Sequence, residues 1–200
     1  MLLVLVVACG GTDEPAQKGS EAEPTAPKLL GVVRSPSLSV EHVFLVDASG
    51  SAVQMKAPAG ELYVLYFGYT SCPDVCPTTM SDLRVAIDDL SPSDAGRVTV
   101  GMTSVDPERD TPEVVREYLG HFFDRSLPLA APDPVSLAAA TDAFGVRYEV
   151  ADHEPGATDY EVSHSAMTYV VDDSGTVVVE WPFGFDSAQM TKDLKTLLED

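Results

Sequence analysis

Residues 66–77 read Tyr66-Phe67-Gly68-Tyr69-Thr70-Ser71-Cys72-Pro73-Asp74-Val75-Cys76-Pro77. They continue a nearly unbroken apolar run over residues 61–67, which is typical of a buried strand. Pro77 suits the first turn of a helix, because the N–H groups of that turn have no acceptor within the helix. The helical pattern continues with one apolar face, formed by Met80, Leu83, Ile87 and Leu90. The sequence therefore predicts a strand-to-helix corner that carries two thiols, Cys72 and Cys76.

Periodicity and turn residues predict the elements around this corner. Strands are expected at residues 97–105, 127–130 and 148–151, and hairpins at residues 40–46 with 52–56 and at residues 166–171 with 176–181. Helices are expected after Thr111-Pro112, from Asp133-Pro134 to Gly145, and over residues 187–198. This order predicts an α/β, thioredoxin-like fold, in which helices flank a central mixed sheet with an N-terminal hairpin.

The composition fits one acidic domain with a substantial core. The chain has 200 residues, of which 44% are hydrophobic, and its 12 basic and 32 acidic residues give a formal net charge of -20. This charge argues against nucleic-acid binding, because phosphates would repel the chain. It is consistent with solubility in a crowded compartment and also with attraction of a basic partner or a cation.

The first nine residues resemble a bacterial lipoprotein signal. They form an apolar run that ends in Val7-Ala8-Cys9, and such a signal is cut before the cysteine, which then carries lipid. The alternative is an incidental cysteine after a short apolar stretch, which cannot span a bilayer as a helix. Residues 10–38 are expected as a flexible tether and residues 39–200 as the folded domain. We therefore expect a domain in the cell envelope, anchored to the membrane through Cys9 and facing the periplasm or the cell exterior, where dithiols are readily oxidised.

Cys72 and Cys76 stand at a place that favours reactive sulfur. The N–H groups and dipole of a helix N-terminus stabilise a thiolate, and cysteines at this spacing can approach closely enough for a disulfide. The pair is therefore a candidate redox-active dithiol. Two thiolates also suit the soft ion Cu(I), whereas a closed zinc site needs more ligands than two cysteines and one histidine supply. The Cys-x-x-x-Cys spacing, one residue longer than in thioredoxin-type oxidoreductases, favours the metal.

Four histidines are candidates for a further ligand, and they are His42, His121, His153 and His164. His164 stands out because it lies just before the hairpin that starts at residue 166. In a thioredoxin-like fold the loop that enters this hairpin faces the dithiol corner. A lone histidine is more often a surface or core residue, so the residues alone leave ligation by His164 open. The other three are expected to be such ordinary histidines.

Three motifs, in consistent order, resemble the Sco/SenC family of copper proteins. They are residues 66–77, the run Ser104-Val105-Asp106-Pro107-Glu108-Arg109-Asp110-Thr111-Pro112, and Asp159-Tyr160-x-Val162-x-His164-Ser165. The resemblance implies a thioredoxin-like, membrane-anchored, exported protein that helps to assemble the dinuclear copper (CuA) centre of cytochrome c oxidase. It also implies that Cys72, Cys76 and His164 bind copper as Cu(I) or Cu(II). Some members have Asp directly before the histidine, where this chain has Ser163, which removes the carboxylate that those members offer the imidazole.

Other residues of these motifs have two interpretations. Asp74 and Asp106 would support a copper site, or Asp106 would set a turn while Asp110 helps to cap the next helix. Arg109 is expected to pair with a carboxylate that the sequence does not identify. The remaining candidates are expected in the core, and they are Met80, Met102 and Trp181.

Two functions of different classes follow from these observations. A copper metallochaperone would deliver copper to the copper-bearing subunit of cytochrome c oxidase. A thiol-disulfide reductase would instead keep the cysteines of that acceptor reduced through Cys72 and Cys76. Either function implies a further partner, which is a copper donor or a thiol reductant. A purely structural disulfide is a weak alternative, because a bridge across four residues constrains little of the unfolded chain.

Overall fold

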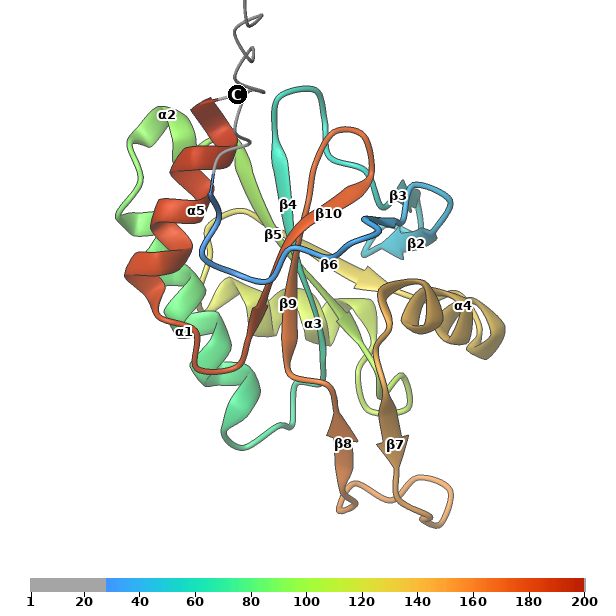
Figure 1. Ribbon diagram of the computed structural model, residues 1–200. Helices are drawn as coiled ribbons and strands as arrows, with labels where there is room; N and C mark the ends of the chain where they lie inside the picture. Colours follow the sequence, from blue (N-terminus) through green and yellow to red (C-terminus); the bar gives the residue numbers. More distant parts are fainter. Residues whose placement is uncertain (1–27, 200) are drawn as a thin grey trace, which may run out of the picture.

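The computed structural model describes residues 28–199 as an eight-stranded mixed sheet, a separate two-stranded ribbon and five helices. The strands of the sheet, in spatial order, are β1 (Leu38–Ser39), β10 (Thr176–Pro182), β9 (Met167–Val171), β4 (Leu62–Gly68), β5 (Val98–Ser104), β6 (Ser126–Ala130), β2 (Phe44–Asp47) and β3 (Ala52–Gln54). The ribbon consists of β7 (Tyr148–Val150) and β8 (Val162–His164). The helices are α1 (Val75–Asp88), α2 (Pro92–Ala95), α3 (Pro112–Gly120), α4 (Pro134–Phe144) and α5 (Ser187–Glu199). Figure 1 shows α1 and α5 together on one side of the sheet and α4 on the other side.

The pairing at the centre of the sheet creates one functional edge. β4, β5 and β6 run parallel, and β9 pairs with β4 in the antiparallel direction. Gly68 ends β4 opposite Ser104, which ends β5, so the chain leaves both strands at the same edge. The segment with the two cysteines therefore meets the loop that follows β5. The β7–β8 ribbon extends beyond this same edge (Figure 1).

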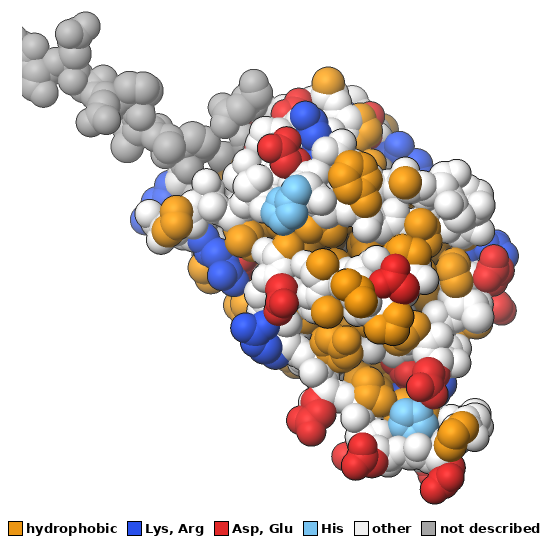
Figure 2. Space-filling view, turned by 90° about the vertical axis from the view of Figure 1, so that its right-hand side faces the viewer, with side chains coloured by type: hydrophobic (Ala, Val, Ile, Leu, Met, Phe, Trp, Pro, Cys, Tyr) orange, Lys and Arg blue, Asp and Glu red, His pale blue; other side chains and the backbone are white. Residues whose placement is uncertain are grey.

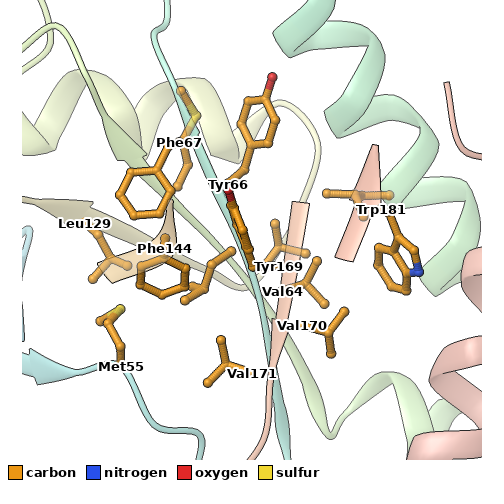
Figure 3. Close-up of a cluster of buried hydrophobic side chains, with 14 of the residues drawn as sticks. Met55, Val64, Tyr66, Phe67, Leu129, Phe144, Tyr169, Val170, Val171 and Trp181 are labelled. Carbon is orange, nitrogen blue, oxygen red and sulfur yellow. The ribbon is translucent and has the colours of Figure 1, made fainter. Parts of the chain in front are cut away.

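The core has one layer on each face of the sheet, because successive residues of a strand point to opposite faces. Phe67 of β4 packs on Phe144 of α4, with ring centroids 5.1 Å apart. In Figure 3, Phe67, Leu129 and Phe144 lie on one side of the sheet, and Val170 and Trp181 lie on the other. None of these five side chains is more than 1% exposed. Burial on both faces explains why β4 is apolar along its whole length.

Local sequence signals predicted most of these elements, including the N-terminal hairpin β2–β3 and the thioredoxin-like order. Thr111 caps α3, Asp133 caps α4, and Gly145 follows α4 with a φ of 71°, which is the left-handed region that glycine adopts at little cost. The expectation that Asp110 helps to cap α3 is wrong. The cap is Thr111, whose side-chain oxygen accepts a hydrogen bond from the backbone N–H of Val114. Three short elements were not predicted, and they are β1, α2 and β8.

Residues 30–34 belong to the segment that was expected as a tether, and they contact the domain. The backbone N–H groups of Leu30 and Gly31 donate to the Asp193 carboxylate of α5 at 2.7 and 2.9 Å. Val32 forms an antiparallel bridge with Glu180 of β10. The expected signal, Cys9 and the first part of the tether lie outside the described residues. Within residues 28–199, no helix combines the length and the apolar character needed to cross a bilayer.

Acidic side chains are concentrated near the ribbon. Five exposed ones lie in or next to it, and they are Glu149, Asp152, Glu154, Asp159 and Glu161. Figure 2, which faces the side of α4, shows acidic side chains at the end of the molecule where the ribbon lies and hydrophobic side chains over the middle of this face. The functional edge is therefore bordered by negative charge, which would repel nucleic acid.

Candidate metal centre

The two cysteines lie on either side of the point where α1 begins. Cys72 lies in the turn before the helix, where its N–H donates to the carbonyl of Tyr69 at 3.3 Å. Cys76 lies in the first turn of α1 and its side chain is fully buried, whereas that of Cys72 is partly exposed. Both are free thiols, and the backbone N–H of Cys76 donates to Cys72 Sγ at 3.4 Å. The corner predicted from the sequence thus carries one sulfur that solvent can reach, on Cys72, and one that is enclosed by the protein, on Cys76.

These surroundings shift the pKa values of the two thiols in opposite directions. Burial favours the neutral thiol of Cys72, but hydrogen bonds from the N–H groups of Cys76 and Asp74 and from the side chains of Cys76 and Tyr69 outweigh it. The pKa of Cys72 is therefore lowered below its ordinary value. Burial raises the pKa of Cys76 to about 12. Cys72 is therefore the thiol that ionises first, and Cys76 keeps its proton until a base or a metal ion displaces it.

His164 ends β8 and points its ring at the buried sulfur. Its Nε2 atom lies 3.4 Å from Cys76 Sγ, and its Nδ1 atom lies 3.1 Å from the carbonyl oxygen of Ser165. A carbonyl oxygen only accepts, so Nδ1 carries the hydrogen and Nε2 presents its lone pair toward Cys76. Burial lowers the pKa of His164, which favours this neutral form. The Ser165 carbonyl thus orients the ring.

Three donor atoms from segments far apart in the chain converge here. Sγ of Cys72, Sγ of Cys76 and a ring nitrogen of His164 all lie within 4.8 Å of one another. Metal bonds of about 2.3 Å to sulfur and about 2.0 Å to imidazole nitrogen would place such atoms roughly 3.5–4.5 Å apart. The separations therefore fit a single metal ion, and among residues 28–199 no other group of His, Cys, Asp and Glu side chains meets this geometric criterion.

Two tyrosines of the same sequence stretch enclose the site, a role that the sequence reasoning missed. The hydroxyl of Tyr66 donates to Cys76 Sγ at 3.8 Å, and the rings of Tyr66 and Tyr69 both meet the His164 ring edge-on, with centroids 5.7 and 5.8 Å away. Burial raises the pKa of both tyrosines, so both remain donors at neutral pH. Gly68 makes room for this packing, because a Cβ there would lie 2.6 Å from the Tyr66 ring and 3.0 Å from Cys76 Sγ.

The acidic candidates separate into distinct roles. Asp74 precedes α1 with an exposed side chain that makes no capping hydrogen bond. Asp106 is 1% exposed and pairs with Arg109, which identifies the carboxylate that the sequence left open. Asp110 accepts hydrogen bonds from Thr70 and from Ser104, and so ties the cysteine segment to the end of β5.

The remaining candidates lie in the core, on the surface or in the ribbon loop. Met80, Met102 and Trp181 are at most 1% exposed and belong to the core, as predicted. His42 and His121 are exposed. His153 stacks on Tyr160 in the loop between β7 and β8, so it is not an isolated surface residue, and it is not one of the three converging donors.

The fold and the geometry together define a thioredoxin-like protein with a candidate site for a soft metal ion. Its sequence belongs to the SCO1/SenC family, whose model matches residues 34–199. The SCO2-like protein RP587 of Rickettsia prowazekii is 34% identical over 131 residues, which are 66% of this chain and 63% of that protein. The chain thus spans less than two thirds of this relative.

Two solved structures show the same architecture. The copper-bound structure of Bradyrhizobium japonicum ScoI is 32% identical, with a TM-score of 0.66 over 76% of this chain and 95% of that chain. The apo Sco1 protein of Thermus thermophilus is also 32% identical, with a TM-score of 0.71 over 84% of this chain and 95% of that chain. Both likenesses confirm the predicted family and fold class.

Proposed function

We propose that this protein binds one copper ion through Cys72, Cys76 and His164 and delivers it to the CuA centre of cytochrome c oxidase. The convergence of two sulfur atoms and one imidazole nitrogen within 4.8 Å carries the proposal. Thiolates prefer Cu(I), and an added imidazole suits Cu(II), so this set of ligands can bind copper in both oxidation states. The copper in the related ScoI structure of Bradyrhizobium japonicum supports the choice of metal.

Copper titration of the purified protein tests the binding step. We expect the reduced protein to take up one Cu(I) per chain and the Cys72–Cys76 disulfide form to take up none. His164→Ala should retain Cu(I) but lose Cu(II) and its thiolate-to-copper absorption. The control is His42→Ala, which replaces an exposed histidine far from His164 in the sequence and should behave as the wild type. Equal copper uptake by the reduced and oxidised forms would contradict the proposal.

A transfer assay tests delivery. Copper-loaded protein is mixed with the copper-free, reduced CuA domain of the oxidase subunit, and the spectrum of the acceptor is followed. We expect the CuA absorption to develop with the loaded wild type and not with Cys76→Ser. Loss of copper to a small chelator but never to the acceptor would leave a binding protein without the delivery function.

Thiol-disulfide reduction is the second candidate, and the opposite acidities of the two thiols favour it. The Cys72 thiolate would attack a disulfide of the acceptor, release the first acceptor thiolate and form a mixed disulfide. Cys76, after giving up its proton, would then attack Cys72 Sγ and release the second acceptor thiolate, and the two released thiolates take up this proton and one from water. Two electrons pass to the acceptor, which gains two thiols, while Cys72 and Cys76 become a disulfide that an external thiol reductant must reduce again. Disulfide exchange by copper-free protein, measured beside copper transfer, separates the two functions.

We also propose that Cys9 carries lipid and holds the domain to a membrane of the cell envelope. The apolar run before Cys9 supports this anchor. Growth with a labelled fatty acid should label the wild type and Cys72→Ser equally, and should not label Cys9→Ser. A labelled Cys9→Ser protein that remains in the membrane fraction would refute the anchor.

A further inference from the structure

The part of the chain that carries His164 has little support of its own. β7 and β8 share only three residue pairs, Tyr148↔His164, Glu149↔Ser163 and Val150↔Val162, and they form a sheet separate from the main one. A two-stranded ribbon of this kind is at best marginally stable in water. Figure 1 shows it extending beyond the edge of the main sheet. Side-chain contacts must therefore hold it against the body of the domain.

Arg109, in the loop between β5 and α3, supplies the first of these contacts. Its side chain is only 11% exposed. Its Nη1 atom donates to the carbonyl oxygens of Thr158 and Tyr160, both at 3.1 Å, and its Nε atom donates to Asp106. The guanidinium also lies over the Tyr160 ring, 3.7 Å from its centroid. Arg109 thus binds both the backbone of the segment that leads into β8 and the ring of Tyr160 in that segment.

Tyr160 completes the contact from the ribbon side. Its hydroxyl donates to Asp106 Oδ1 at 2.6 Å, so Asp106 binds Arg109 and Tyr160 together. The His153 ring stacks on Tyr160 with centroids 3.7 Å apart and planes 10° apart. The Arg109 guanidinium and the His153 ring both lie 3.7 Å from the Tyr160 centroid, and two groups this close cannot share one face of the ring. They therefore cover opposite faces. We call Asp106, Arg109, Tyr160 and His153 the ribbon clamp.

We propose that Arg109 and Tyr160 are positioning residues for His164, which they hold at the two thiols without touching the metal. The inference rests on the proposed copper function. Tyr160 is four residues before His164, and the backbone between them is fixed by the β7–β8 pairing and by the Ala151 N–H bond to the Glu161 carbonyl. A shift at the clamp is therefore passed on to the imidazole. The thiols are held by other contacts, which are those of α1 and the Asp110 bonds to Thr70. Arg109 also lies 5.6 Å from the centroid of the Tyr69 ring, so Tyr160→Leu is the variant that changes the ribbon side alone.

This separation predicts a selective defect. The clamp variants Arg109→Gln and Tyr160→Leu should weaken Cu(II) binding by roughly 10- to 100-fold, which is the range known for residues that orient a metal ligand. Their Cu(I) affinity, measured by competition with a chromophoric chelator, should stay within a few-fold of wild type. Tyr160→Phe keeps the stacked ring and should restore most of the Cu(II) affinity. Arg147→Gln is the matched control, since Arg147 directly precedes β7 but its exposed side chain pairs only weakly with Asp142.

Amide hydrogen exchange of the copper-free protein gives a readout that needs no metal. We expect residues 148–150 and 161–164 to lose protection in Arg109→Gln and Tyr160→Leu, with β4 and β5 unchanged. Unchanged ribbon protection in both variants would overturn the inference, and so would equal losses of Cu(I) and Cu(II) affinity. A wild type that binds no copper, but whose ribbon still loosens in the variants, would refute the proposed function and leave the clamp intact. If Arg109→Gln does not fold, the loop variant Tyr160→Leu decides alone.

Discussion

Removal of the Asp110 carboxylate should loosen the segment that carries Cys72. Asp110 is 3% exposed, and its Oδ2 atom accepts from the Thr70 N–H at 2.8 Å and from Ser104 Oγ at 2.7 Å. Its Oδ1 atom accepts from Thr70 Oγ1 at 2.5 Å. In Asp110→Ala all three donors lose their acceptor. A hydrogen bond to a charged group contributes about 1.5–3 kcal/mol, and bonds within one network do not add fully, so we expect the free energy of unfolding to fall by about 4 kcal/mol.

Asp110→Asn should be far milder. The single oxygen that remains can stay with the Thr70 N–H and Ser104 Oγ, and the new amide group can donate to Thr70 Oγ1, because a hydroxyl can also accept. All three contacts then survive without the charge. We expect a loss of about 1 kcal/mol for this variant.

Urea denaturation of the reduced, copper-free protein measures both losses, and the alkylation rate of Cys72 under native conditions measures the local effect. Cys72 should react faster in Asp110→Ala than in the wild type or in Asp110→Asn. Equal destabilisation by the two variants would show that the charge, and not the set of hydrogen bonds, is what matters. A loss below about 1 kcal/mol in Asp110→Ala would refute the view that this residue holds the segment.

Three further predictions follow from buried or titrating groups. Both ring nitrogens of His153 face acceptors, the Ala151 carbonyl and Glu108, which raises the pKa of His153 above its ordinary value. Its contribution to ribbon protection should be complete below pH 6.5 and lost as the pH rises through the raised pKa, and His153→Gln should abolish this dependence in hydrogen exchange. Iodoacetamide at pH 7 should modify Cys72 well before Cys76, as peptide mapping will show, and the reverse order would contradict the assigned acidities. Phe144→Ala should cost about 3–5 kcal/mol in urea denaturation because the fully buried ring fills the core beside Phe67, and a cost below about 1.5 kcal/mol would contradict that packing.

The dithiol corner could be predicted from the sequence because every signal for it is local. The apolar run that becomes β4, the turn residues and Pro77 all lie within a span of 17 residues, from 61 to 77. The position of His164 needed more than local signals. Its approach to Cys76 depends on the order of strands in the sheet, which the thioredoxin-like topology supplied.

The strand at residues 148–151 was predicted and corresponds to β7, but β8 and the clamp could not be predicted, because their contacts involve few residues that lie far apart in the sequence. β8 is only three residues long, too short for an alternation of apolar and polar residues to be recognised. Arg109 reaches the Tyr160 carbonyl across 51 residues, and the Tyr160 hydroxyl reaches Asp106 across 54 residues. The sequence indicated that Arg109 needs a carboxylate, but only the folded chain shows that the same carboxylate also holds Tyr160.

The two halves of the candidate site differ in how firmly they are held, and this difference bears on how copper would leave it. Cys76 is in α1, whose buried side chains belong to the hydrophobic core, while His164 is on the three-pair ribbon that, by our inference, the clamp holds in place. Under the proposed function, Cu(II) needs the imidazole and therefore needs the ribbon in place, whereas two thiolates suffice for Cu(I). An acceptor that binds the acidic ribbon and draws it outward would remove the imidazole first. In the Cu(I)-loaded protein the ion would then be held by two sulfurs, with Cys72 partly exposed, and would be open to stepwise exchange with the thiolates of the acceptor. Retention and release would thus be governed by the imidazole of His164, while the dithiol keeps the ion bound until the new sulfur ligands arrive.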